Sequence, residues 1–238
     1  MAGWRGLAGA LLMLAASAAA ARAQAPSPAP SAAPDVGAGP IYVVTYFDVM
    51  PANSRKTATL LHQFAAATRK AVGNTELTVL REIGRPGRFA IVEAWRDKPA
   101  LEAHGAAMKA LGEQLQPAFT SPFETRQFLP LSVGPKPAAD LVGAVVVLTH
   151  VDVFPAGKEQ VAALVKSHAE DSRKDPGMQR FDAVVWEGRP NHFHLIEAWS
   201  DRKARNAHVL AEHTRQFRTK VTPFEGALYD ERLYQPLR

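Results

Sequence analysis

Three residue types that together could form an acid–base site occur twice in this chain at the same spacing. The two sets lie 104 positions apart: Glu93, Trp95 and His104, then Glu197, Trp199 and His208. A neutral imidazole in an apolar pocket can take a proton from a phenolic group, and a buried carboxyl group can hold one. The indole ring adds an apolar wall with one N–H donor. We therefore treat all six as candidate catalytic residues.

Each residue type also has a purely structural interpretation. The Glu could bond to a neighbouring backbone group or to an Arg at the end of a strand. The Trp could be a core anchor, and the His a core imidazole with satisfied hydrogen bonds. A site is favoured because all three recur together, and because helical spacing turns each His inward, toward the strand that carries Glu and Trp.

The repeat extends well beyond these residues. The offset of 104 holds without a gap between 45–104 and 149–208, and it matches Gly84-Arg85-Pro86 with Gly188-Arg189-Pro190. A unit of roughly 90 residues is far longer than a solenoid repeat. The chain therefore carries two copies of one small domain.

The apolar pattern predicts the elements that position these residues. In the second copy a strand at 144–153 precedes a helix at about 158–174, which ends at Asp175-Pro176-Gly177. Two strands joined by the Gly-Arg-Pro turn follow, then one helix that begins after Asp201. The remaining strands are expected at 41–49, 77–82, 89–95, 123–128, 180–186, 193–199 and 228–233. The order β-α-β-β-α-β in each copy is that of the ferredoxin-like unit.

The first and third strands of each copy are apolar on both faces, yet helices can cover only one face of such a sheet. The other copy is the obvious cover for the second face. We predict an α+β fold in which two tandem ferredoxin-like βαββαβ modules pack sheet to sheet as an intramolecular pseudo-dimeric α/β barrel. The sequence leaves open whether this barrel pairs again with a second chain.

The regions outside the modules have signals of their own. Residues 1–23 have the pattern of a secretory signal peptide, and 24–39 are rich in Pro, Ala and Ser, as in a disordered tether. Module 1 then spans 40–131, a linker 132–142 and module 2 143–238. The N-terminal apolar run of roughly 15 residues is shorter than the ~20 of a bilayer-spanning helix. We expect an exported protein, periplasmic or secreted, without a stable membrane anchor after cleavage.

Composition narrows the partners and cofactors. The chain has 28 Lys and Arg against 23 Asp and Glu, and it has no cysteine to form disulfides. No basic run is interleaved with aromatic residues, so we expect no nucleic-acid partner. His150, His192 and His194 could offer metal ligands, but no carboxylate stands at ligand spacing and the first copy lacks the set. We expect neither a metal nor another cofactor.

The two copies differ in their histidines. The second copy has His168 where the first has Phe64, and His150 where the first has Tyr46. It also has His213 at a position where the first copy has no histidine. We expect these five residues to line the two pockets and to bind substrate. A first-copy pocket would be the more apolar, so if one pocket works, the sequence favours the second.

The motifs of the second copy resemble those of the antibiotic biosynthesis monooxygenase family, which includes quinol monooxygenase-like proteins of the dimeric α/β-barrel group. The resemblance covers nearly all of both modules. It rests on Pro155-Ala156-Gly157-Lys158-Glu159, Ser172-Arg173-Lys174-Asp175-Pro176-Gly177, Glu197-Ala198-Trp199-Ser200-Asp201, and His208 with His213. The first copy departs further, with Lys109 at the position of His213 and Ala71-Val72-Gly73 in place of Asp-Pro-Gly.

The resemblance implies cofactor-independent oxygenation of a phenolic or quinol-like small molecule by dioxygen. Trp199 would line the pocket, His208 would act as base or orienting group, and Glu197 would hold a proton or an orienting hydrogen bond. Haem-degrading relatives use an Asn on the first strand, and neither 41–49 nor 144–153 contains one, so a haem function is the weaker alternative. The main alternative is an exported protein that binds a small ligand, or serves in stress, without catalysis.

Overall fold

The computed structural model describes residues 39–136, 141 and 143–237, so the predicted signal peptide and nearly all of the predicted tether lie outside the described residues. The first half contains β1 (Ile41–Val49), α1 (Ser54–Thr68), β2 (Asn74–Glu82), β3 (Arg88–Trp95), α2 (Lys98–Leu115) and β4 (Phe119–Ser132). The second half contains β5 (Val145–Asp152), α3 (Lys158–Ser172), β6 (Met178–Trp186), β7 (His192–Trp199), α4 (Arg202–Leu210), α5 (Glu212–Val221) and β8 (Asp230–Pro236). Short 3₁₀ turns flank the helices at Pro51–Asn53, Gln116–Ala118, Pro155–Gly157 and Thr222–Phe224.

The eight strands form one closed antiparallel barrel in the order β1-β3-β2-β8-β5-β7-β6-β4. The halves meet at two seams, where β2 pairs with β8 and β4 pairs with β6. Leu80 faces Pro236 across one seam, and its repeat counterpart Val184 faces Pro130 across the other. Because both seams have this same register, an internal twofold axis relates the halves. The predicted pseudo-dimeric barrel of two ferredoxin-like modules is confirmed, and its two sheets also hydrogen-bond along both edges.

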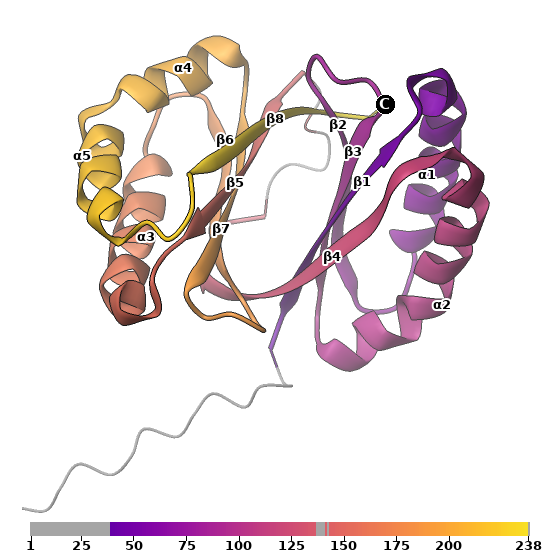
Figure 1. Cartoon of the computed structure of the whole chain (residues 1–238), viewed down its shortest axis with the longest axis horizontal. Coiled ribbons are helices and arrows are strands. Elements are labelled where there is room, and N and C mark those ends of the chain that lie inside the picture. The colour runs from indigo at the N-terminus through magenta and orange to yellow at the C-terminus, as the bar shows by residue number, and fades with distance from the viewer. Residues whose placement is uncertain (1–38, 137–140, 142, 238) are drawn as a thin grey trace, which may run out of the picture. The chain divides into compact units, whose positions relative to one another are not determined.

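The helices lie outside the barrel, with α1 and α2 against one sheet and α3, α4 and α5 against the other (Figure 1). Alternation along each strand therefore separates an apolar core inside the barrel from apolar cores outside it. The barrel interior holds Tyr42, Val44 and Tyr46 of β1, and an outer core lies between each sheet and its helices. Burying one large apolar side chain contributes roughly 1.5–3 kcal/mol, so these cores supply the main stabilisation of a chain without disulfides.

Two elements differ from the sequence-based expectation. Strand β4 runs from Phe119 to Ser132, longer than the predicted strand, because it pairs first with β1 and then crosses to β6. The single helix expected after Asp201 is two helices, α4 and α5, with Ala211 extended between them (φ −63°, ψ 147°). His208 and Thr214 would point about 120° apart on a continuous helix. The break turns both of them inward.

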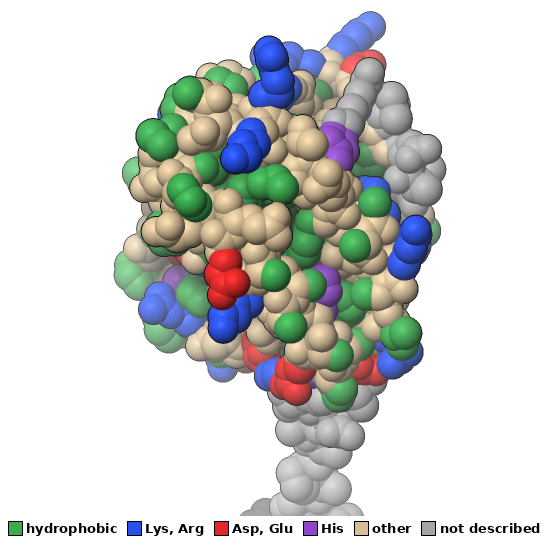
Figure 2. All heavy atoms as spheres, turned by 90° about the vertical axis from the view of Figure 1, so that its right-hand side faces the viewer, with side chains coloured by type: hydrophobic (Ala, Val, Ile, Leu, Met, Phe, Trp, Pro, Cys, Tyr) green, Lys and Arg blue, Asp and Glu red, His purple; other side chains and the backbone are tan. Residues whose placement is uncertain are grey.

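The surface over α1 and α2 carries both basic and acidic side chains, scattered among apolar and neutral ones (Figure 2). Charge is therefore not gathered into a patch of one sign on this face. Within the described part of the chain, every helix falls short of the length and apolar character needed to cross a bilayer.

Candidate active site

Glu197, Trp199 and His208 lie together between the second sheet and its helices. Strand β7 presents Glu197 and Trp199 on its outer face, and α4 places His208 over the indole, with ring centroids 4.5 Å apart at an interplanar angle of 26°. The side chain of Asp201 caps α4 by accepting from the Ala204 N–H at 2.8 Å, which fixes where the helix begins. Trp199 is fully buried, and Glu197 and His208 are nearly so. We call this group, with the residues bonded to it, the Trp199 cluster.

Glu197 is a carboxyl group poised to exchange a proton near neutral pH. Trp199 Nε1 donates a hydrogen bond to Glu197 Oε2 at 2.9 Å. Burial raises the pKa of Glu197 to about 7, although this hydrogen bond favours the ionised form. A carboxyl group with such a pKa can hold or release a proton under physiological conditions.

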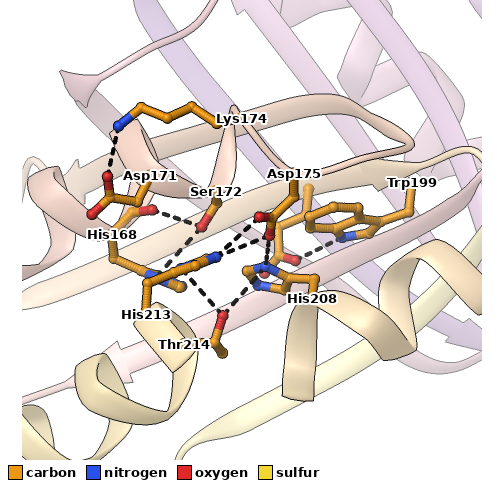
Figure 3. Close-up of polar contacts among 10 residues, drawn as sticks. His168, Asp171, Ser172, Lys174, Asp175, Trp199, His208, His213 and Thr214 are labelled. Carbon is orange, nitrogen blue, oxygen red and sulfur yellow. Dashed lines mark hydrogen bonds and ion pairs between the residues drawn. The ribbon is translucent and has the colours of Figure 1, made fainter. Parts of the chain in front are cut away.

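Asp175 holds the histidines of this cluster in place. One of its carboxylate oxygens lies 2.8 Å from His208 Nδ1, and both oxygens lie 3.1 Å from His213 Nε2 (Figure 3). Thr214 Oγ1 lies 3.3 Å from the same His208 nitrogen. Asp175 sits at the turn after α3, where Gly177 adopts φ +81° and a Cβ would meet the Ala204 Cβ at 2.6 Å. Glycine thus lets this turn close against α4 and bring Asp175 to His208.

The hydrogen bond to Asp175 selects the tautomer of His208. A carboxylate only accepts, so Nδ1 carries the proton and Nε2 keeps its lone pair. Among the described residues no hydrogen bond reaches His208 Nε2. Burial lowers the pKa of His208, an effect that Asp175 opposes, so the imidazole is neutral at pH 7. This is the state that a general base requires.

His168, also expected to bind substrate, lies at the far side of the same cluster. Its ring stacks on Phe217 at 4.1 Å and lies 5.5 Å from the His208 ring. Burial, together with the neighbouring histidines, lowers the pKa of His168 to about 3, so it stays neutral. It therefore adds a polar but uncharged wall where the first module has Phe64.

The equivalent group in the first module, which we call the Trp95 cluster, is simpler. His104 packs on Trp95 at 4.7 Å and on Phe64 at 5.5 Å, and its Nε2 lies 3.4 Å from Thr68 Oγ1 and 3.6 Å from Glu93 Oε1. Burial raises the pKa of Glu93 to about 7 and lowers that of His104. Within the described residues Trp95 Nε1 has no hydrogen-bond partner. This His has neighbours but no carboxylate bond to orient it.

Tyr46 and His150 do not join either cluster. They lie inside the barrel, with ring centroids 5.6 Å apart, and Tyr46 OH is 3.3 Å from His194 Nε2. Burial lowers the pKa of His150 to about 4. These two residues face away from Glu197 because the inner and outer faces of a strand alternate.

Asp175, His208 and His213 also have the residue types of a metal site. Their ligand atoms lie within 4.8 Å of one another, which makes them the one such set among the described residues. Two imidazoles and a carboxylate could hold a divalent ion. The same three groups are joined by the hydrogen bonds described above.

Trp199, Glu197 and His208 are buried beneath the helices that cover the second sheet. Three cavities of about 460, 730 and 470 Å³ open on the surface, and none is lined by a residue of this cluster. The cluster comes nearest to solvent at Asp175 and His213, whose side chains are 18% and 26% exposed.

Sequence reasoning missed three members of this cluster: Asp175, Thr214 and Phe217. Asp175 was interpreted only as part of a helix-ending Asp-Pro-Gly. The available signal was that Asp-Pro-Gly and His213 both occur in the second copy and are both replaced in the first. Thr214 and Phe217 carried no signal, because the break before α5 that turns them inward is not visible in the apolar pattern.

Comparisons with known proteins agree with this architecture. A protein from Fusobacterium nucleatum subsp. nucleatum, provisionally assigned as a monooxygenase, is 18% identical with a TM-score of 0.77, over 84% of this chain and 94% of that one. Another from Lactobacillus acidophilus NCFM is 17% identical with a TM-score of 0.71, over 84% and 95%. An anthrone oxidase-like protein is 16% identical with a TM-score of 0.61, over 86% and 93%. At these identities the likeness establishes the fold alone. No curated protein matches the sequence at a significant level.

The domain described as antibiotic biosynthesis monooxygenase matches the sequence twice, at residues 40–110 and 144–220. The first segment contains the Glu, Trp and His of the Trp95 cluster, and the second contains the Trp199 cluster. Together the two segments cover more than half of the chain. The chain therefore belongs to the antibiotic biosynthesis monooxygenase family and carries two copies of its domain in one barrel.

Proposed function

We propose that this protein is a monooxygenase that oxidises a phenolic or quinol-like small molecule with dioxygen at the Trp199 cluster. The observation that carries the proposal is the hydrogen bond from His208 Nδ1 to Asp175, because it leaves Nε2 as an oriented base against the Trp199 ring. Membership of a monooxygenase family supports the reaction class. The proposed reaction needs no metal and no organic cofactor.

In the proposed reaction His208 Nε2 takes the proton of the phenolic hydroxyl. The resulting phenolate is electron-rich enough to reduce dioxygen directly. In the net reaction the phenolic hydroxyl and one ring C–H each lose one hydrogen, that ring carbon takes up one oxygen atom of dioxygen as a quinone carbonyl, and the other oxygen atom leaves as water with those two hydrogens. The substrate supplies all four electrons, so atoms and electrons balance. Glu197, with its pKa near 7, holds or returns a proton during these steps.

Substrate access in this proposal requires movement of α4. His208 is the one buried side chain of this nine-residue helix, and the break at Ala211 separates it from α5. A short helix held by few buried groups opens at low cost, as lids do. The substrate ring would then lie beside His208 and Trp199, with the hydrogen bond from His208 to Asp175 kept.

Oxygen uptake by the purified protein tests the proposal. We expect consumption of dioxygen with hydroquinones or dihydroxynaphthalenes, and one water and one quinone carbonyl for each dioxygen. Absence of turnover across a broad phenol panel, with ligand binding retained, would support the alternative of a non-catalytic binding protein. A haem titration tests the remaining alternative, a haem-binding protein. Haem binding would shift the Soret band, and an unchanged band would exclude this alternative.

We also propose that the protein acts outside the cytoplasm, in the periplasm or beyond it. The support is the sequence pattern of residues 1–23, which has the basic start, apolar run and small-residue end of a signal peptide. Cell fractionation and N-terminal sequencing of the mature chain test this. A mature chain that retains Met1 and stays in the cytoplasm would contradict it.

A further inference from the structure

Two pairs of repeat-equivalent residues meet inside the barrel. Tyr46 and His150 are 104 positions apart, and their rings contact each other at 5.6 Å. Glu76 and Arg180 are also 104 positions apart, and they form an ion pair. A residue that touches its own repeat counterpart lies on the axis that relates the copies. In a barrel of two identical modules, each axis position would face a copy of itself.

The pair of Glu76 and Arg180 carries opposite charges at such a position. Arg180 is 3% exposed, and its Nε also donates to Asp182 Oδ2 at 2.8 Å. Glu76 belongs to β2 of the first module, whereas Arg180 and Asp182 belong to β6 of the second. The first-module counterpart of Asp182 is Thr78, so that module supplies one carboxylate and no cation at this level of the barrel.

We propose that this buried charge pair makes a first module pair with a second module. It disfavours a barrel made of two first modules or of two second modules. Two first modules would place Glu76 against Glu76 with no buried cation. Two second modules would place Arg180 against Arg180, each with only its own Asp182. Both arrangements remove charges from water without an opposite charge across the axis, which a matched pair avoids.

The partner of each module is therefore the other module, from the same chain or, by exchange, from a second copy of this chain. Every barrel then contains one Trp95 cluster and one Trp199 cluster. This pairing rule does not depend on the proposed reaction, because Glu76 and Arg180 lie on the inner face of the sheets and the clusters lie on the outer face.

A charge-swap series in the full chain tests the inference. Arg180→Glu sets a new carboxylate against both Glu76 and Asp182 and should lower Tm by roughly 10 °C. Glu76→Arg combined with Arg180→Glu restores opposite charges with the same net charge and should recover most of that loss. The matched control is Lys98→Glu, which breaks the Lys98–Glu187 pair between the modules; those side chains are 39% and 22% exposed, so Tm should change little.

If Arg180→Glu does not fold, the double variant still tests the inference. The inference requires the double variant, in which the two charges are exchanged, to fold with a Tm within a few degrees of the natural chain. A double variant as unstable as the single one would overturn the inference. A second experiment measures directly which modules pair. A protease site is inserted at 135–139, the folded chain is cut there, and the two halves are unfolded and refolded together. Native mass spectrometry should find the mixed pair, and self-pairs at comparable abundance would contradict the inference.

Discussion

The Trp95 and Trp199 clusters share a Glu, a Trp and a His on the same elements, yet they differ in what orients the histidine. In the first module Phe64 and Trp95 pack around His104, and the carboxylate found near its ring among the described residues, that of Glu93, lies 3.6 Å away, beyond hydrogen-bond distance. In the second module Asp175 accepts from His208 at 2.8 Å, and the indole N–H of Trp199 is bonded to Glu197. The shared residues build the same buried arrangement in both modules, and the second module adds the hydrogen bonds on which the proposed proton transfer depends.

The largest effect on this comparison is expected from Asp175→Asn. The amide can present its NH₂ group to His208 and favour the wrong tautomer, with Nε2 protonated. We expect kcat for oxygen uptake to fall roughly 100-fold, with little change in Tm. Ala71, the first-module counterpart, supplies the control: Ala71→Asn should leave the rate unchanged. Equal rates in the natural chain and Asp175→Asn would remove the difference we draw between the clusters.

Glu197→Gln tests the feature that the clusters share. Burial raises the pKa of Glu197 to about 7, above its unfolded value, so the folded state binds more protons between about pH 4.5 and 7. The contribution of Glu197 to the free energy of unfolding is fully present below that range. It falls by up to about 3 kcal/mol as the pH rises through the range. Relative to the natural chain, the Gln variant should gain stability from pH 5 to pH 8.

Glu93→Gln should behave in the same way, because burial also raises the pKa of Glu93 to about 7. Urea unfolding of both variants at the two pH values measures the effect. If neither substitution changes how stability varies between pH 5 and pH 8, these carboxyl groups are already ionised in the folded protein at pH 5.

Replacing each Trp by Phe distinguishes the two indole N–H groups. Both substitutions remove similar volume from a fully buried site. Trp199→Phe also leaves Glu197 without its donor at 2.9 Å, whereas Trp95 Nε1 acts on Glu93 by lowering its pKa but makes no hydrogen bond of normal geometry among the described residues. We expect Trp199→Phe to cost about 1–2 kcal/mol more than Trp95→Phe in urea unfolding. A larger cost for Trp95→Phe would reverse the assignment.

The smallest effect is expected from His213→Lys, which installs the residue of the first module. His213 is partly exposed, so its bond to Asp175 should contribute less than about 1 kcal/mol. Lysine can still reach the carboxylate, and His208 keeps its own bond. We expect a rate within a few-fold of the natural chain. A loss as large as that of Asp175→Asn would mean that His213, and not only His208, takes part in the proton transfer.

The fold could be predicted from the sequence because its signals are local and repeated. Two apolar-faced strands, a Gly-Arg-Pro hairpin and an Asp N-cap occur in both copies at one offset, and apolarity on both strand faces requires a second sheet. The closure of the barrel depends on the length of β4, where Phe119–Ser132 crosses from β1 to β6. That crossing is a long-range pairing without a local sequence signal.

The site could be predicted only in part. Glu197, Trp199 and His208 follow from strand alternation and helical spacing, which depend on near neighbours in the chain. Asp175 reaches His208 from another element through the Gly177 turn, and Thr214 through the break at Ala211. Tyr46 and His150, predicted to line the pockets, lie inside the barrel and away from both clusters. The sequence could not place them there, because it does not indicate which face of the first strand the helices cover.

Oxygen uptake by His208→Ala and His104→Ala tests the central claim most directly. The two substitutions remove the same side chain from equivalent positions, so they differ only in the cluster affected. With a dihydroxynaphthalene substrate, we predict that His208→Ala slows uptake at least 100-fold and that His104→Ala changes it less than a few-fold. Equal losses in both variants, or a larger loss in His104→Ala, would contradict the assignment of the reaction to the Trp199 cluster.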